Sequence, residues 1–466
     1  MSGMAHAYTY RARSVADPAT GRVGLETSGG VTTTGRVAHP RFFTGFLAAA
    51  EQAATGLLAV ADVAQARYYN PQLTVLRDPV VTCGGDRLRF ESFSGCCGVY
   101  ARLDVLSGAL DGEVIDRGTT NVDVNGALRE ALARVGGGDP LRLTVGPDEL
   151  AVTTLDGPVV EKKVPLPERW LRGFTEVQVI TAAFDPRAEL PAIEAVRFLR
   201  SLPRPRGRSR ASVALWAVPA GRSLRLSARP VPGAVCLPGP ERLEALWPLL
   251  RFARSLRAYG PVAAAGSPPL ASAWELELPE MRLVLTLSPE PRRGFSGEGA
   301  ALHALADDDT AADADLVGAL LAFEPRVEVD LLAERAGLPA DRIRAALAQL
   351  GTAGRVGFDV TEAAYFHREL PYDPDRVERM NPRLRNARAL VEAGAVRLRG
   401  DLATVTVDDH AQRVRFTPDG AASCTCPWWA KYRGSRGPCK HVLAAGIARR
   451  EARSAIDPSG SVTGGR

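Results

Sequence analysis

Three cysteines and a histidine gather near the C-terminal end of the chain. Cys424, Cys426, Cys439 and His441 stand in the spacing C-x-C-x12-C-x-H. Thiolate sulfur and imidazole nitrogen are the ligands that zinc prefers, and four of them complete a tetrahedral shell that leaves no position for substrate or water. The spacing therefore predicts one structural zinc ion.

The residues around this cluster predict a small sheet followed by a helix. Three stretches alternate polar and apolar residues as strands do, at 395–400, 403–409 and 412–418, and His441 begins an alanine-rich helical run. Three strands and one helix form too small a core to be stable alone. We therefore expect folding of this unit to depend on the metal.

This arrangement resembles the SWIM-type zinc finger, whose pattern is C-x-C-x(n)-C-x-H with a variable spacer, preceded by strands and followed by a helix. The resemblance covers residues 395–450 and includes all four ligand positions. It implies that the four residues are the zinc ligands. SWIM fingers occur in otherwise unrelated proteins, bacterial ones among them, and are thought to bind DNA or proteins. The resemblance therefore implies a nucleic acid, DNA first, or a partner protein.

The spacer between the second and third cysteines mixes aromatic rings with cations. Flat rings that stack on bases, beside cations that bind phosphates, are typical of a nucleic-acid surface. Arginines at alternate positions of two predicted strands would share one sheet face. Alternatively, one or both tryptophans pack on the zinc site and the cations are solvated. The candidate nucleic-acid contacts are Trp428, Trp429, Lys431, Tyr432, Arg433, Arg436, Arg397, Arg399, Arg413 and Arg415.

Positive charge is concentrated in the same region. Residues 376–453 hold 16 Lys plus Arg against 7 Asp plus Glu, so the net charge of this segment is +9. The whole chain has a net charge of +5, so the rest of the chain carries −4. A concentrated basic patch is a candidate surface for a polyanion.

Residues 311–372 follow the order helix, helix, helix, hairpin, with Gly337 ending the second helix and Pro339 near the start of the third. This order resembles a winged-helix domain, in which the third helix would contact DNA. Residues 313–370 carry ten acidic and six basic residues, however, and a net negative charge opposes phosphate binding. A structural or protein-contacting role is therefore favoured over DNA recognition.

The first 199 residues predict an α+β domain. Strands are expected at 73–76 and 88–93 and in a hairpin of 141–145 with 149–155. Helices are expected over 43–65 and after Asn125, a potential N-cap.

The remaining segments are shorter. Residues 200–239 predict a linker region rich in Arg, Pro and Gly, and residues 240–310 a helix that begins at Pro240 and is closed by Gly260, followed by a hairpin over 274–287. The zinc unit spans 376–453, and 454–466 predict a disordered tail. The expected fold class is α+β multidomain: a mixed α/β N-terminal region, a winged-helix-like segment, and a small sheet plus helix at the C-terminus.

Several classes of protein are excluded or disfavoured. No apolar run approaches 18 residues and the first residues lack the apolar core of a secretion signal, so we expect a cytoplasmic protein without a membrane span. No phosphate-binding, nucleophile-elbow or dinucleotide motif is present, so neither a catalytic residue nor a small-molecule substrate is predicted. Cys83, Cys96 and Cys97 lack a ligand spacing and are expected to be buried.

These observations favour a non-catalytic, zinc-binding adaptor whose C-terminal finger contacts nucleic acid or a partner protein. The first alternative is a protein–protein adaptor in a bacterial assembly with an AAA-type ATPase and a von Willebrand A-like protein, beside which some SWIM proteins are found. The second is an enzyme without a recognisable motif that the finger recruits.

Overall fold

The computed structural model describes most of the chain. The described residues are 41–68, 79–122, 124–164, 166–203, 214–290, 292–306, 309–322, 324–370, 381–418 and 421–456, with the backbone of four short strands before them, β1 (Val15–Asp17), β2 (Arg22–Gly24), β3 (Gly30–Thr32) and β4 (Gly35–Val37). The chain forms two compact units. Unit 1 comprises 1–166, 185–293 and 323–325, and unit 2 comprises 167–184, 294–322 and 326–466.

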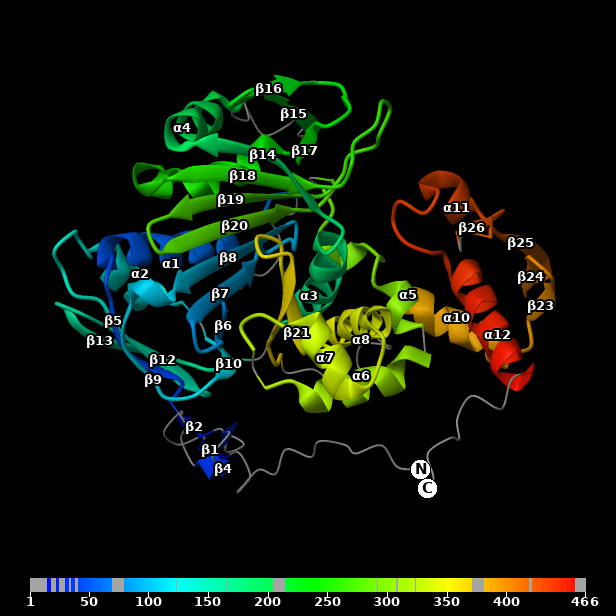
Figure 1. Cartoon of the computed structure of the whole chain (residues 1–466), viewed down its shortest axis with the longest axis horizontal. Helices are drawn as coiled ribbons and strands as arrows, with labels where there is room; N and C mark the ends of the chain where they lie inside the picture. Colours follow the sequence, from blue (N-terminus) through cyan, green and yellow to red (C-terminus); the bar gives the residue numbers. More distant parts are fainter. Residues whose placement is uncertain are drawn as a thin grey trace. The chain divides into compact units, whose positions relative to one another are not determined.

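Unit 1 is built around an eight-stranded antiparallel sheet in the order β10-β6-β7-β8-β20-β19-β18-β14. Figure 1 shows β18, β19, β20, β8 and β7 following one another across this sheet. Its strands are β6 (Val80–Cys83), β7 (Arg87–Phe93), β8 (Val99–Leu106), β10 (Gly118–Asn121), β14 (Asp185–Pro191), β18 (Ser255–Gly260), β19 (Ser272–Leu278) and β20 (Met281–Leu287).

Two smaller sheets and several helices complete unit 1. The sheets have the orders β13-β12-β11-β5-β9 and β16-β15-β17. Their strands are β5 (Phe43–Leu47), β9 (Leu110–Val114), β11 (Arg142–Val145), β12 (Glu149–Thr154), β13 (Gly157–Lys162), β15 (Ala214–Ala220), β16 (Ser223–Ser227) and β17 (Val235–Pro238). The helices are α1 (Ala50–Gln65), η1 (Ser107–Ala109), α2 (Gly126–Ala133), α4 (Ala192–Ser201) and η2 (Pro240–Phe252).

The element order of unit 1 contains an internal repeat that the sequence does not reveal. The strand order β13-β12-β11-β5 recurs as β20-β19-β18-β14, and β10-β6-β7 recurs as β17-β15-β16. Helices α1 and α2 of the first half stand at the same places in the element order as α4 and η2 of the second half. Strands β8 and β9 have no counterpart among the described residues of the second half, and β8 pairs with β20 to join the halves into one sheet.

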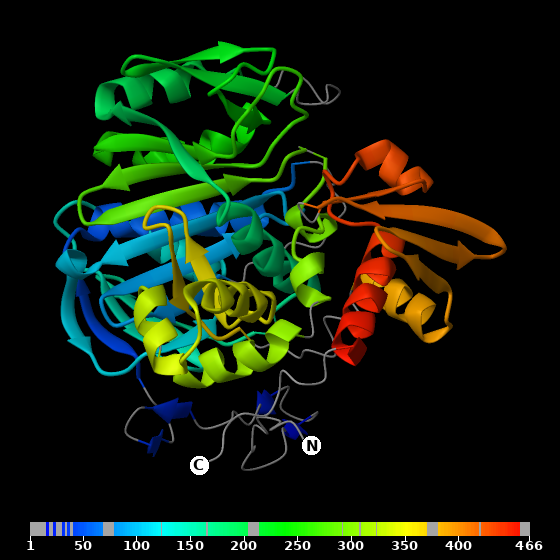
Figure 2. The same ribbon diagram turned by 45° about the vertical axis from the view of Figure 1, so that its right-hand side comes forward.

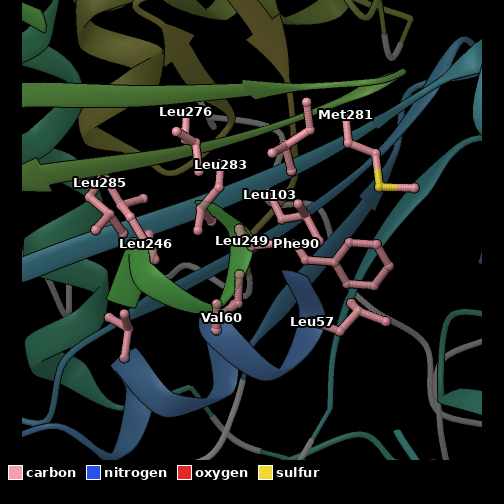
Figure 3. Close-up of a cluster of buried hydrophobic side chains, with 14 of the residues drawn as sticks. Leu57, Val60, Phe90, Leu103, Leu246, Leu249, Leu276, Met281, Leu283 and Leu285 are labelled. Atoms are coloured by element: carbon pink, nitrogen blue, oxygen red, sulfur yellow. The ribbon is translucent and has the colours of Figure 1, made fainter. Parts of the chain in front are cut away.

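One face of the large sheet is apolar and is covered by α1 and η2. Figure 3 shows Leu57 and Val60 of α1 and Leu246 and Leu249 of η2 meeting strand residues such as Leu283. A fully buried leucine contributes about 1.5–3 kcal/mol. This face is therefore the main core of unit 1.

The opposite face of the same sheet carries buried charges. Arg89, Asp104 and Arg282 are direct cross-strand neighbours on β7, β8 and β20. The Asp104 carboxylate is fully buried and lies 2.6 Å from Arg282 Nε, 3.1 Å from Arg102 Nε and 3.5 Å from Arg89 Nε. Charges this deeply buried are stable only when they are paired.

Several local predictions for unit 1 are confirmed. The hairpins form as β11–β12 and β19–β20, and residues 88–93 lie in β7. The Asn125 side chain accepts a hydrogen bond from the amide of Leu128 and caps α2. Predicted strand 73–76 lies outside the described residues.

Other predictions for unit 1 are wrong. The helix predicted over 43–65 begins only at Ala50, because residues 43–47 form β5 between two strands distant in sequence. The predicted helix from Pro240 is a 3₁₀ helix that ends at Phe252. It does not reach Gly260, because residues 255–260 form strand β18 between β14 and β19. The predicted linker region 200–239 contains β15, β16 and β17.

Unit 2 contains a winged-helix segment and the zinc finger. Its first part has α3 (Glu168–Thr181), η3 (Phe295–Gly297), α5 (Leu302–Leu305), α6 (Asp309–Leu320), α7 (Val329–Ala336), α8 (Ala340–Thr352), β21 (Val356–Asp359) and β22 (Ala364–His367). The predicted three helices and hairpin are thus confirmed, with Gly337 in the left-handed conformation after α7. No helix within the described ranges is long and apolar enough to cross a membrane.

Candidate metal centre and basic sheet

The zinc finger is a four-stranded antiparallel sheet packed against a helix. Helix α12 lies along one face of the sheet (Figure 2). The finger consists of β23 (Val396–Arg399), β24 (Leu402–Val407), β25 (His410–Phe416), β26 (Ala422–Cys424), α11 (Pro427–Tyr432) and α12 (Lys440–Ile456), and α10 (Pro382–Glu392) precedes it. The three predicted strands are confirmed. Strand β26, helix α10 and the short helix α11 in the spacer were not predicted.

The four predicted ligands come from the ends of three elements. Cys424 ends β26, Cys426 is the N-cap of α11, and Cys439 and His441 flank the start of α12. Their ligand atoms all lie within 4.8 Å of one another, and all four residues are buried. His441 Nδ1 lies 3.9 Å from Cys424 Sγ.

The geometry and chemistry of this cluster fit a zinc ion. Sulfur ligands about 2.3 Å from a tetrahedral zinc lie roughly 4 Å apart, which agrees with the observed grouping. The hydrogen bond from Cys424 lowers the pKa of Cys439, which favours a thiolate in the cluster. The amides of Trp429 and Val442 point at Cys426 Sγ and Cys439 Sγ, each at 3.4 Å, and would stabilise bound thiolates. These residues hold one structural zinc ion.

Two aromatic residues of the spacer, Trp428 and Tyr432, make cation–π contacts with arginines of the protein itself. The guanidinium carbons of Arg383 and Arg436 lie 4.9 and 5.0 Å from the ring centroid of Trp428. Arg436 also lies 4.8 Å from the ring centroid of Tyr432. We call these four residues the cation–aromatic stack. Such contacts contribute about 0.5–2 kcal/mol each.

The stack attaches the finger to residues 295–306, which include η3 and α5 and are called the platform below. Arg383 donates to the carbonyl of Glu298 at 2.6 Å, and Arg436 donates to that of Gly297 at 2.8 Å. A Cβ at Gly437 would lie 2.0 Å from the carbonyl oxygen of Gly299, so only glycine fits there. Apolar residues of α5, α10 and α12 share a core: Leu302, Ala306, Leu384, Ala387, Leu443, Ala444 and Ile447.

These contacts change the interpretation of the spacer. Both Trp428 and Trp429 pack against the zinc-site core, as the alternative interpretation of the spacer expected. Arg436, which stacks on Trp428 and Tyr432, also holds the finger to the platform. Lys431 and Arg433 are exposed at the end of α11. The two tryptophan rings therefore contact protein.

Glu176 on α3 contacts the platform from within unit 2. It is buried and accepts hydrogen bonds from the amides of Ala300 at 2.8 Å and Ala301 at 3.3 Å. Burial raises the pKa of its carboxyl from 4.5 to about 8, although the two amides oppose the rise. Because the folded state binds this proton more tightly than the unfolded chain, the stabilisation is complete below pH 4.5 and is lost as pH rises through about 8.

We expect Glu176→Gln to unfold near the wild-type temperature at about pH 5 and several degrees above it at about pH 9, because the amide never acquires the buried charge. Thermal unfolding of both full-length proteins, measured in parallel, tests this. Since both carry the same zinc site, its own pH dependence cancels. An equal difference at the two pH values would contradict the titration of Glu176.

The outer face of the finger sheet carries the four predicted arginines. Arg397 pairs with Thr404, which pairs with Arg413, and Arg399 pairs with Leu402, which pairs with Arg415. All four arginines are exposed, whereas Ala403, Val405 and Val414 face α12 and are buried. The predicted shared face is confirmed, and we call Arg397, Arg399, Arg413 and Arg415 the arginine face. Across the described residues, no carboxylate pairs with any of them.

The third helix of the winged-helix segment lacks such free cations. Arg342 on α8 contacts both carboxylate oxygens of Asp313, with Nε 2.7 Å from Oδ2, and Arg344 lies 2.9 Å from Asp341. Each of the two arginines of the helix that would enter a DNA groove is therefore paired with an aspartate of the same segment.

The other cysteines do not add a metal site. Cys83, Cys96 and Cys97 are buried as predicted, as is Cys236. Of the residues that the structure describes, only the four finger ligands are grouped as a metal would require.

Comparison with known families agrees with this geometry. Residues 414–449 match the SWIM zinc finger, and residues 301–357 match the DprA winged helix domain. The chain is thus a zinc-binding protein of mixed α/β, multidomain architecture. Its zinc is held by a C-terminal SWIM finger, and a segment similar to the DprA winged helix precedes it.

Whole-chain comparisons add little. A search of the curated proteins finds no match. Proliferating cellular nuclear antigen from Entamoeba histolytica aligns at 10% identity, over 54% of this chain and 100% of its own, with a TM-score of 0.34. A PCNA2-PCNA3 complex from Sulfolobus tokodaii aligns at 12% identity, over 53% of this chain and 99% of the matched chain, with a TM-score of 0.37. At these TM-scores neither likeness assigns a function.

Proposed function

We propose that this protein is a non-catalytic, cytoplasmic adaptor that binds nucleic acid through the arginine face of its zinc finger. The observation that carries the proposal is the set of four exposed arginines on one sheet face, without carboxylate partners among the described residues. Cations gathered in this way bind phosphates and release counterions. A reducing compartment is consistent with a three-thiolate zinc site.

The zinc ion supports this function indirectly. It fixes β26 against α12, and β26 pairs with β25, which carries Arg413 and Arg415. Zinc bound by the four ligands would thus support the strand next to Arg413 and Arg415, and this role needs no open coordination position.

Replacing the arginine face tests the proposal. We expect the full-length, zinc-loaded protein to bind a labelled DNA duplex with an affinity that falls as salt rises. Four Arg→Gln changes on the face should make the negative slope of log K against log salt shallower by about 3–4. Fluorescence anisotropy over a salt series measures both quantities. The variant carries Arg397→Gln, Arg399→Gln, Arg413→Gln and Arg415→Gln.

A control variant with the same change in charge separates the face from net charge. It replaces four exposed arginines of unit 1, Arg222, Arg225, Arg229 and Arg254, with Gln. Its affinity should stay close to wild type. No binding by the wild-type protein even at low salt, or equal loss in both variants, would refute the proposed function.

A second function is favoured by the winged-helix segment. Its third helix pairs both arginines with aspartates, while Leu316 on α6 and Leu331 on α7 are 43% and 53% exposed. Exposed leucines on an acidic surface suit a protein partner better than DNA. We propose that this segment contacts protein, in keeping with an adaptor, and a protein pull-down that Leu316→Ser and Leu331→Ser weaken together would support it.

A further inference from the structure

The arrangement of the arginine face suggests which form of nucleic acid it takes. The four arginines form two columns, Arg397 with Arg399 on β23 and Arg413 with Arg415 on β25, and β24 lies between the columns. Two strand spacings place the columns about 10 Å apart, and two residues along a strand separate the members of a column by about 7 Å.

These dimensions match a duplex better than a single strand. The grooves of B-form DNA are about 6 and 12 Å wide between its two phosphate backbones. Columns about 10 Å apart, carrying long side chains, can reach phosphates on both sides of a groove. A single strand has one backbone and would occupy one column at a time.

The residues between the columns also favour a duplex over a single strand. Leu402 and Thr404 of β24 occupy the centre of the face. The two cross-strand rows, Arg397–Thr404–Arg413 and Arg399–Leu402–Arg415, contain no aromatic residue. Single-strand binding relies on stacking of bases on aromatic rings. The rings nearest in sequence already stack with cations of the protein, Trp428 with Arg383 and Arg436 and Tyr432 with Arg436.

The ends of the face are less favourable for phosphate. Asp408 and Asp409 form the tight turn between β24 and β25 with φ angles of 46° and 64°, and both are exposed. Asp401, at the other turn, is paired with Arg449 at 3.3 Å. Positive charge that can attract phosphate is thus confined to the centre of the face, where the two arginine columns stand.

Resting on the proposed function, we infer that the arginine face straddles a groove of duplex DNA, with one arginine column on each phosphate backbone. The contacts are to phosphates and carry no base readout, so binding is independent of sequence.

Pairs of substitutions with equal charge but different geometry test this inference. A column variant, Arg397→Gln with Arg399→Gln, removes contact with one backbone, whereas a row variant, Arg397→Gln with Arg413→Gln, leaves one arginine on each. Anisotropy is measured on the full-length protein with duplex DNA, duplex RNA and single-stranded DNA of one length at one salt concentration.

We expect wild type to prefer duplex DNA over single-stranded DNA by about tenfold or more, a difference of roughly 1.4 kcal/mol. The column variant should lose most of that preference, and the row variant should bind more weakly but keep it. Equal or tighter binding of single strands by wild type, tighter binding of duplex RNA, or equal preferences in the two variants would overturn the inference. Each of these results would leave nucleic-acid binding itself intact, whereas no binding to any probe would refute the proposed function.

Discussion

Cys439→Ser is expected to lose the zinc ion and to unfold the finger. The Cys439 sulfur lies within 4.8 Å of the other three ligand atoms, and the residue stands at the start of α12, which packs on all four strands. Zinc binding contributes about 10–16 kcal/mol to the folding of small finger units, more than this sheet and helix could replace. The zinc content of the purified protein should fall from about one equivalent to nearly none.

The structure predicts how far the unfolding extends. The platform shares an apolar core with α12 and holds the finger through Arg383 and Arg436. Amide hydrogen exchange should therefore accelerate in residues 381–456 and also in 295–306, while unit 1 stays protected. Cys236→Ser, which changes a buried cysteine of unit 1, serves as the control and should keep its zinc. A Cys439→Ser protein with one equivalent of zinc and unchanged exchange would disprove the ligand assignment.

The zinc site could be predicted from sequence because its determinants are local. All four ligands fall between Cys424 and His441, and the strands that carry the arginine face are consecutive along the chain. Alternation along β23 and β25 was therefore enough to place Arg397 and Arg413 on one face.

The role of the aromatic spacer could not be predicted in the same way. Trp428 and Arg436 look like a nucleic-acid surface when only their neighbours are considered. Their partners include the carbonyl of Gly297, 139 residues before Arg436, and nothing in the sequence marks that carbonyl. The internal repeat of unit 1 was missed because it is a repeat of strand order without a motif at a fixed period.

The buried charges of unit 1 could not be predicted from the sequence either, because their partners are also distant along the chain. Arg282 lies 178 residues after Asp104, and only the pairing of β8 with β20 brings the two together. In the sequence, Arg89, Asp104 and Arg282 each have the pattern of a solvent-facing strand residue. The structure shows instead that they form a buried cluster, and this changes what a substitution there should do.

Asp104→Asn is expected to destabilise unit 1 by about 3–5 kcal/mol. The carboxylate lies within 3.5 Å of guanidinium nitrogens of Arg89, Arg102 and Arg282, and all of these side chains are less than one-tenth exposed. An amide of the same shape leaves the buried positive charges without this counter-charge. Hydrogen exchange of the β8 and β20 amides measures the free energy of opening this strand pair.

Two further variants separate charge from packing. Asp111→Asn on β9, where the carboxylate is exposed, should change stability by no more than about 0.5 kcal/mol. Combining Asp104→Asn with Arg282→Met removes one of the guanidinium charges that Asp104 contacts and should restore part of the loss, because the two residues contact each other. If Asp104→Asn costs less than about 1 kcal/mol, or if Arg282→Met adds to the loss, the cluster is not held by its charges. The expected outcomes would show that the Asp104 carboxylate and its three arginines stabilise the β8–β20 pairing that joins the two halves of unit 1.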